Sequence, residues 1–193
     1  MRLFIATPLS DHVVGCLDRL ISRFAAQGGK VKWVRPGNIH LTLRFLGDTP
    51  EDQLPELRNL IDRTAASISP VETEAIRLGG FPNLNRPRVI WVGLAPSAEP
   101  LAKLAAQIEQ ELRRVCFKAE EKPFRAHLTL GRVKDSRDLA ALLNFLKTYK
   151  FDPFPVTLDR LVLFQSVLTP KGPVYTRLHE ALLGGVSQER FGG

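Results

Sequence analysis

The stretch that decides the fold is HLTLRFLG at residues 40–47, because its first four letters return as HLTL at residues 127–130. In a strand, successive side chains point to opposite faces, so each copy places His and Thr on one face and two Leu on the other. The chain has only 4 histidines, and two of them open these words. The copies lie 87 residues apart (127 − 40) in a chain of 193. This spacing predicts a duplicated α+β unit with one His–Thr strand in each half.

Hydrophobic periodicity predicts the elements around the two words. Strands are predicted over residues 2–7, 30–35, 40–47, 71–81, 88–94, 158–168 and 173–182, and from His127 onward. Helices are predicted over residues 10–27, 49–67, 98–116 and 136–148. The segment FDPFP is interpreted as a break between elements. Since no long linker separates the halves, we expect one bilobal domain over residues 1–193, with two facing sheets and a flexible tail from about residue 184.

The composition is that of a basic globular protein. There are 27 Lys and Arg against 20 Asp and Glu, a net charge of +7, which favours a polyanionic partner such as nucleic acid. Basic residues flank both words: Lys30, Lys32, Arg35 and Arg44 around the first, and Arg125, Arg132 and Lys134 around the second. No run of about 18 apolar residues is present, so we expect no membrane association.

The two cysteines, Cys16 and Cys116, show neither metal-ligand spacing nor a disulfide framework. Both fall in predicted helices, where we expect them to be small buried hydrophobic residues. The N-terminal MRLFIATPLSD lacks a small-residue cleavage site and is interpreted as a first strand. We therefore expect a cytoplasmic protein.

Two His–Thr pairs that face each other across a cleft predict a specific chemistry. One imidazole can act as general base and the other as general acid near neutral pH. The Thr hydroxyls and a nearby Arg can bind the oxygens of an anion. This arrangement suits displacement at phosphorus without a metal or other cofactor. Zinc binding is the competing interpretation, but neither word carries a Cys, Asp or Glu on its polar face. His12 and His179 lie outside the repeat, and we expect them to be surface or packing residues.

The two words and their surroundings, KWV.PGNIHLTLRFLGD and PFRAHLTLGR, resemble those of the two-histidine phosphoesterases. The resemblance is nearest to the bacterial and archaeal RNA 2′,3′-cyclic phosphodiesterases, long called 2′-5′ RNA ligases. It extends through MRLFIA, RPRVIWVGL and SVLTPKGPVY, and so covers nearly the whole chain. One departure is Ala126, where many relatives have Pro before the second His.

The resemblance implies a fold, an activity and a set of site residues. The fold is two pseudo-symmetric α+β lobes, each with an antiparallel sheet and flanking helices, around a central groove. The activity is opening of a 2′,3′-cyclic phosphate at an RNA end, such as that of a tRNA fragment, to leave a 2′-phosphate. His40 would be the proton donor and His127 the proton acceptor, with Thr42, Thr129 and Arg132 on the phosphate. We expect a monomer.

Strict alternation assigns a face to each of the two arginines that follow the words, Arg44 and Arg132. It places Arg132 on the face of the leucines, unless Gly131 marks a bulge or the residue acts from the strand end. It places Arg44 on the face of His40. Phe45 or Trp33 could stack on a base, although both are expected in the core.

Three alternatives stay open on the sequence alone. The first is an RNA-end binding module whose histidines only hold phosphate. The second is the same site used for 2′-5′ ligation, and the third is the same site acting on a cyclic nucleotide. The residues that serve hydrolysis would serve the reverse reaction equally.

Overall fold

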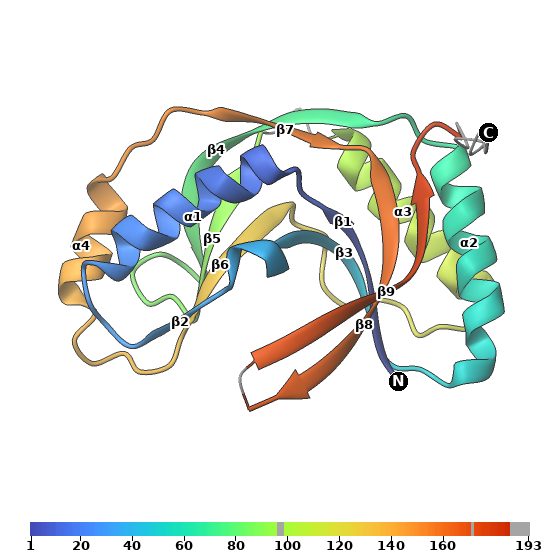
Figure 1. Ribbon diagram of the computed structural model, residues 1–193, viewed down its shortest axis with the longest axis horizontal. Helices are drawn as coiled ribbons and strands as arrows, with labels where there is room; N and C mark the ends of the chain where they lie inside the picture. Colours follow the sequence, from blue (N-terminus) through green and yellow to red (C-terminus); the bar gives the residue numbers. More distant parts are fainter. Residues whose placement is uncertain (96–98, 171, 186–193) are drawn as a thin grey trace, which may run out of the picture.

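The computed structural model describes residues 1–95, 99–170 and 172–185 as an α+β protein with two sheets and flanking helices (Figure 1). The elements follow in the order β1 (Arg2–Pro8), α1 (Asp11–Ala25), β2 (Val31–Trp33), a 3-10 turn (Pro36–Asn38), β3 (His40–Asp48), a second 3-10 turn (Glu51–Gln53), α2 (Leu54–Ala66), β4 (Val71–Phe81), β5 (Val89–Leu94), α3 (Glu99–Arg114), β6 (His127–Val133), α4 (Ala140–Thr148), β7 (Phe154–Leu158), β8 (Arg160–Thr169) and β9 (Gly172–Leu182).

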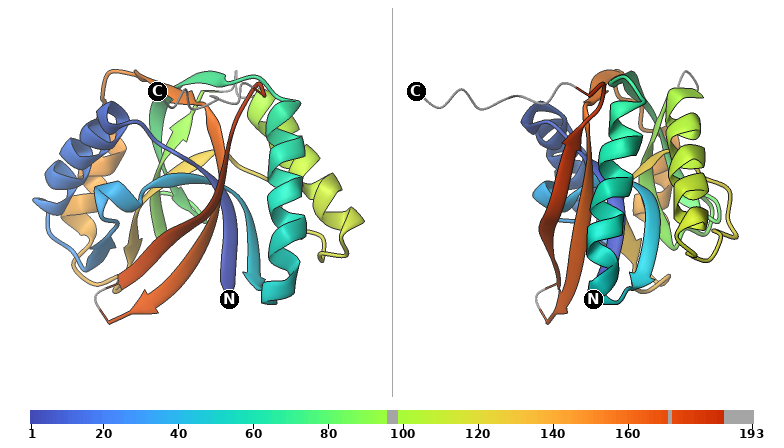
Figure 2. Two further views of the ribbon diagram at one scale, coloured as in Figure 1. Left: turned by 45° about the vertical axis from the view of Figure 1, so that its right-hand side comes forward. Right: turned by 90° about the vertical axis from the view of Figure 1, so that its right-hand side faces the viewer.

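Every strand pairing in the two sheets is antiparallel. The first sheet has the order β3-β1-β8-β9 and the second has the order β2-β6-β5-β4-β7. The sheets adjoin where β3, at the edge of the first, contacts β6 of the second. Helix α2 packs on β8 and β9, whereas α1 packs against β2, β7 and α4 (Figures 1 and 2). The expected α+β architecture with two antiparallel sheets is confirmed.

The two sheets are not built from the two halves of the sequence. The N-terminal half contributes β2, β4 and β5 to the second sheet, and the C-terminal half contributes β8 and β9 to the first. Each sheet therefore needs strands from both ends of the chain. One hydrophobic cluster joins residues of both sheets and of all four helices.

The leucines of the two words lie in this common core. Leu41, Leu128 and Leu130 are fully buried, and Leu43 is 7% exposed. The prediction that His and Thr share one face while the leucines share the other is confirmed up to the end of each word. A second, smaller cluster lies apart from the main core and consists of Phe4, Ala6, Val162 and Phe164, with Tyr175 packed against it.

One strand, β7 (Phe154–Leu158), is not predicted by the sequence pattern. The segment FDPFP predicts a break between elements, but β7 begins at Phe154 and includes Pro155, which pairs with Glu74 of β4. Proline cannot donate a ladder hydrogen bond, and it is tolerated in a strand mainly at a sheet edge. Since β7 is an edge strand, Pro155 does not prevent it from forming.

The prediction for the cysteines was wrong. Helix α3 ends at Arg114, so Cys116 lies beyond it, exposed and with a positive φ of 64°. Cys16 is on α1 but only half-buried, because the buried stripe of that helix passes through Val13 and Leu17 instead. The tail expected to be flexible from about residue 184 lies mostly outside the described residues. In the described part of the chain, no helix is long and apolar enough to cross a membrane.

Candidate active site

Both His–Thr strands carry a β-bulge at the same letter of the word. In β3 the extra residue is Leu43, which is skipped between the paired residues Thr42 and Arg44. In β6 the extra residue is Leu130, which is skipped in the pairing with β5. A bulge places two residues opposite one, so the alternation of faces is inverted for the residues that follow. The residues after each word therefore change sides.

The bulge at Leu130 turns Arg132 to the face of His127. Gly131 then faces Trp33 on the core side, since a Cβ at Gly131 would come within 2.7 Å of the indole. Arg132 pairs with Lys32 of β2, and both side chains are exposed. Strict alternation therefore gives the wrong face for Arg132, and the alternative considered in the sequence analysis, a bulge beside Gly131, is the one observed.

The bulge at Leu43 has the opposite effect on Arg44, whose predicted position beside His40 is wrong. The Arg44 side chain is only 11% exposed and leaves the His face. Its Nε donates to Glu109 of α3 at 2.8 Å, and its Nη1 lies 3.4 Å from Glu120. A further bond from Nη2 reaches the backbone carbonyl of Lys118. Arg44 therefore ties β3 to α3 and to the segment after it.

Phe45 takes the place on the His40 face that Arg44 leaves. Its side chain is 57% exposed, so the expectation that it lies in the core was wrong. Its ring centroid lies 6.0 Å from that of Phe4, which is stacked on His40. Trp33, in contrast, packs against the core beside Phe24, as expected.

The two imidazoles are held in the same way. His40 Nδ1 lies 2.8 Å from the carbonyl oxygen of Asn38, and His127 Nδ1 lies 2.7 Å from that of Arg125. A carbonyl can only accept, so each Nδ1 carries the hydrogen and donates it. Each Nε2 is thereby left as the atom that can take up or release a proton.

Aromatic rings surround His40. Its ring is stacked on Phe4 with centroids 4.8 Å apart and meets the edge of Tyr175 at 5.3 Å. Phe164 lies 6.0 Å away in a parallel orientation. Burial among these rings lowers the pKa of His40 to about 4, while the bond to Asn38 acts in the other direction.

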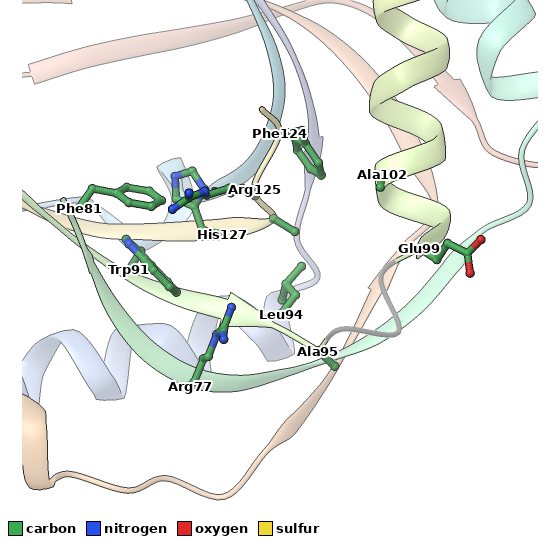
Figure 3. Close-up of a pocket in the computed structure, with 11 residues that line it drawn as sticks. Arg77, Phe81, Trp91, Leu94, Ala95, Glu99, Ala102, Phe124, Arg125 and His127 are labelled. Carbon is green, nitrogen blue, oxygen red and sulfur yellow. Dashed lines mark hydrogen bonds between the residues drawn. The ribbon is translucent and has the colours of Figure 1, made fainter. Parts of the chain in front are cut away.

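His127 stands in the wall of a cavity of about 450 Å³ (Figure 3). Phe81 meets its ring edge-on at 4.9 Å, and Trp91 lies at 6.2 Å. Burial lowers the pKa of His127, and the positive charge of Arg132 lowers it further. The bond to the Arg125 carbonyl opposes both effects.

Arg132 acts on both histidine environments. Its charge lowers the pKa of His127 and opposes the rise that burial gives to the pKa of Tyr175. Since Tyr175 touches His40, Arg132 lies close to both halves of the site. Thr42 and Thr129 follow the histidines on the same faces, and both are half-buried. Among the residues that the structure describes, no group of three or more His, Cys, Asp or Glu could hold a metal ion.

Several residues of the site had not been predicted. They are the aromatic neighbours of the two histidines: Phe4, Phe81, Trp91, Phe164 and Tyr175. They come from other strands, and their positions depend on strand register, which local patterning does not give. His12 is exposed, and His179 pairs with Asp62 at 2.7 Å on the surface, as expected for residues outside the repeat.

A duplicated antiparallel fold with one His–Thr strand in each half defines a two-histidine phosphoesterase. The family model described as LigT-like phosphoesterase matches the chain twice, over residues 8–91 and 92–175, with one word in each match. The chain belongs to this LigT-like phosphoesterase family.

Relatives and solved structures agree with this membership. The chain is 34% identical to a protein of Archaeoglobus fulgidus named RNA 2′,3′-cyclic phosphodiesterase, over 92% of this chain and 98% of the relative. A protein of the same name from Thermotoga maritima is 33% identical, over 96% and 97%. A crystal structure from Thermus thermophilus superposes with a TM-score of 0.81 at 30% identity, over 97% and 100%. Escherichia coli LigT complexed with 3′-AMP shares the fold, with a TM-score of 0.73 at 22% identity over 94% and 97%.

Proposed function

We propose that the protein hydrolyses the 2′,3′-cyclic phosphate at the end of an RNA and leaves a 2′-phosphomonoester. The observation that carries this proposal is the pair of matched imidazoles, each with its Nδ1 bonded to a carbonyl and its Nε2 available. The names of the relatives and the basic surroundings of the site support an RNA substrate. The histidines complete the reaction by acid–base catalysis, with no metal or cofactor.

In this mechanism the two histidines act on opposite sides of the phosphorus atom. His127 Nε2 accepts a proton from the attacking water, and a new P–O bond forms. The bond from phosphorus to the 3′ oxygen breaks, and His40 Nε2 gives that oxygen a proton. Thr42, Thr129 and Arg132 bind the two non-bridging oxygens, on which negative charge increases in the transition state.

The low pKa of His40 fits the role of the acid once substrate is bound. The imidazolium of a group with a pKa of about 4 is a stronger proton donor than an ordinary one. In the free protein it is mostly neutral at pH 7, and a bound phosphate anion favours its charged form. Substrate binding therefore raises the pKa of His40, and the ring takes up from solvent the proton that it later donates.

Phe45 provides a stacking surface for the base of the terminal nucleotide. Its exposed ring lies on the His40 side, where the 3′ oxygen departs and the attached ribose remains. Base–aromatic stacking contributes about 1–3 kcal/mol per base.

The test is digestion of an oligonucleotide that ends in a 2′,3′-cyclic phosphate, with EDTA present. The expected result is full activity and a product that ends in a 2′-phosphate. Formation of the 3′-phosphate would contradict the roles given to the histidines. Activity that disappears with chelator and returns with zinc would contradict the metal-free mechanism, and binding without turnover would leave an RNA-end binding module.

A further inference from the structure

The carbonyl that holds His40 belongs to a residue whose side chain is also bound. His40 Nδ1 donates to the backbone oxygen of Asn38 at 2.8 Å. The Asn38 side chain donates from Nδ2 to the backbone oxygen of Pro173 at 3.2 Å, across 135 positions of sequence. Since a carbonyl oxygen can only accept, the amide nitrogen of Asn38 is the atom that faces Pro173. His40 is thereby linked through Asn38 to a distant segment of the chain.

Asn38 is the last residue of the 3-10 turn that precedes β3. The backbone nitrogen of Ile39 donates to Pro36 at 3.0 Å and closes this turn. The Ile39 side chain is buried in the main core, so the chain between Asn38 and His40 is fixed on one side. The bond from Asn38 to Pro173 fixes the turn on its other side.

Pro173 lies near the end of the hairpin formed by β8 and β9, which projects from the body of the protein (Figures 1 and 2). The side chains of Val167, Leu168 and Val174 there are exposed, so little of the hairpin end is packed. In the described part of the chain, no hydrogen bond other than that from Asn38 joins residues 172–174 to a segment outside the hairpin. The Asn38 bond therefore fixes where the hairpin end lies relative to the strand of His40.

The same hairpin touches the imidazole directly. Tyr175 meets the edge of the His40 ring, with centroids 5.3 Å apart and planes at 81°. Tyr175 follows Pro173 by two positions, as His40 follows Asn38. Phe164, from the other strand of the hairpin, lies parallel to the His40 ring at 6.0 Å. The hairpin therefore contacts both the imidazole and the residue that supplies its hydrogen-bond acceptor.

The acceptor of the second histidine has no equivalent support. It is the backbone oxygen of Arg125, in a segment between α3 and β6 that contains no helix or strand. The Arg125 side chain lines the cavity beside His127 and makes no hydrogen bond with the described residues. Within the described structure, His40 alone is connected through the side chain of its acceptor residue to a distant strand.

This asymmetry matches the different demands of the two proposed proton transfers. The 3′ oxygen is bonded to both the ribose and the phosphorus atom, so the proton donor must point at a fixed atom. The attacking water is mobile and can move to meet the base. A displacement of about 1 Å in a catalytic site can lower the rate about 10²-fold. The proton donor is therefore the imidazole whose direction has to be fixed more closely.

We propose that Asn38 is a positioning residue for the proton donor and that the β8–β9 hairpin is the support on which it acts. The bond to Pro173 keeps the backbone oxygen of Asn38 in line with Nδ1 of His40. Nε2 is thereby held in one direction, toward the departing 3′ oxygen. Without the bond the turn can shift, and the imidazole can rotate or carry its hydrogen on the other nitrogen. The inference rests on the proposed function for its effect on rate, whereas the state of the ring is measured separately.

Two leaving groups distinguish positioning of the donor from general damage to the site. Asn38→Ala removes the bond to Pro173 and leaves the backbone oxygen that accepts from His40. We expect kcat for the cyclic phosphate to fall roughly tenfold. For a phosphodiester with an activated aryl leaving group, which needs little protonation, kcat should change by less than about twofold. Equal losses on both substrates, or no loss on either, would overturn the proposal.

Matched variants on the hairpin test the support. Tyr175→Leu removes the ring edge from His40, and we expect the same selective loss on the cyclic phosphate. Tyr175→Phe retains the ring and should retain most of the activity. Val174→Thr, a change of an exposed side chain between the two contacts, should leave both substrates unaffected. If Tyr175→Leu lowered the rate equally on both substrates, the hairpin would not act through the donor and the proposal would be overturned.

The His40→Ala protein provides a test of the route by which Asn38 acts. A residue that acts through His40 has no further effect once the imidazole is removed. Adding Asn38→Ala to His40→Ala should therefore leave the residual rate on the cyclic phosphate unchanged. A further tenfold loss, of roughly the size expected in the unaltered background, would overturn the proposal.

Nitrogen NMR measures the state of the imidazole without turnover. The pKa of His40 is about 4, so at pH 7 the ring is neutral and carries one hydrogen, whose position the chemical shifts of the two ring nitrogens report. We expect this hydrogen on Nδ1 in the unaltered protein and a mixture of both forms in Asn38→Ala. The His40 signals are identified by their loss in His40→Gln.

The NMR result has two outcomes that would overturn the proposal. One is an Nδ1 that lacks the hydrogen in the unaltered protein. The other is an Nδ1 that is equally protonated in the unaltered protein and in Asn38→Ala. Failure of the proposed function is a different result, namely no hydrolysis by the unaltered protein, and it leaves the NMR measurement unaffected.

Discussion

The two His–Thr strands share a bulge and a histidine hydrogen bond but differ in the side chains that follow the word. Both carry a bulge at the fourth letter and both bond Nδ1 of the histidine to a carbonyl two residues earlier. Two positions beyond the bulged leucine, on the face of the histidine, β3 presents Phe45 and β6 presents Arg132. The core-side residues also differ: Arg44 is bound to Glu109, whereas Gly131 lies against Trp33.

This difference shows how a duplicated strand, repeated with the same bulge and the same histidine hydrogen bond, becomes part of an asymmetric site. The shared bulge and the shared hydrogen bond place two equivalent imidazoles. The residue at the fifth position after each histidine then gives one side an aromatic surface and the other side a cation. The proposed division into acid and base follows from surroundings that the repeat itself does not determine.

The largest expected effect tests the equivalence of the two imidazoles. His40→Ala and His127→Ala should each lower kcat for the cyclic phosphate about 10³-fold, within the usual range for general acid–base catalysis. The double variant should be little worse than either, since the pair acts as a unit. His12→Ala, an exposed control, should leave activity unchanged. If either single variant retained a tenth of the activity, the two imidazoles would not contribute equally to catalysis.

The next effect concerns folding stability and pH. The folded-state pKa of His40 is about 4 against an ordinary value of 6.5, so the unfolded chain binds the proton more readily. This contribution to stability is present above pH 6.5 and is lost as pH falls to about 4. The difference of 2.5 between the two pKa values (6.5 − 4) corresponds to at most about 3 kcal/mol. Urea unfolding at several pH values should show this loss, and His40→Gln should reduce it. An equal loss in the variant would contradict the role of burial.

A smaller effect separates Phe45 from Arg132. Arg132→Ala should lower kcat/KM roughly 10- to 100-fold for every cyclic phosphate, because a charged hydrogen bond contributes about 1.5–3 kcal/mol. Phe45→Ala should lower it roughly tenfold for an oligonucleotide and leave a cyclic phosphate without a base unaffected. Steady-state assays with both substrates distinguish these results. Equal losses on the base-free substrate would show that Phe45 supports the site and does not bind the base.

The smallest effect is a displacement between two pH profiles. Burial lowers the pKa of both histidines in the free protein, so kcat/KM should be greatest below pH 6.5. A bound phosphate anion favours the charged forms, so the profile of kcat should lie at higher pH than the profile of kcat/KM. The limits of each profile belong to the pair and not to one residue. Coinciding profiles would show that substrate does not change the protonation of the site.

The sequence predicted what depends on local pattern. Alternation placed His40 and His127 on the face opposite the leucines. This prediction is correct because the bulge in each strand comes only at the fourth letter of the word, after the His and the Thr. Alternation failed at Arg44 and Phe45 because the bulge at Leu43 exchanges the two faces for the residues that follow. The sequence LRFLG contains no residue at the bulge that would predict it. At Arg132 the preceding Gly131 indicated a possible bulge, since glycine in a strand interior often marks one.

The remaining features depend on contacts between distant segments. The placement of β2, β4 and β5 in the second sheet and of β8 and β9 in the first follows from packing over the whole chain, which periodicity does not reveal. Tyr175 reaches His40 from β9, which is more than 130 residues later in the sequence (175 − 40). Trp91 lies opposite Gly79 across the sheet, and this pairing requires the register of β4 and β5.

The division of labour between the two histidines is tested most directly by varying the leaving group. Each alanine variant is assayed on the cyclic phosphate and on a phosphodiester whose leaving group is an activated aryl oxide, which needs little protonation. If His40 is the proton donor, His40→Ala should lose much less activity on the aryl substrate than on the cyclic phosphate. His127→Ala should lose the same factor on both, because each reaction still needs water to be deprotonated. Recovery of His127→Ala, and not of His40→Ala, by the better leaving group would contradict this assignment and reverse the two roles.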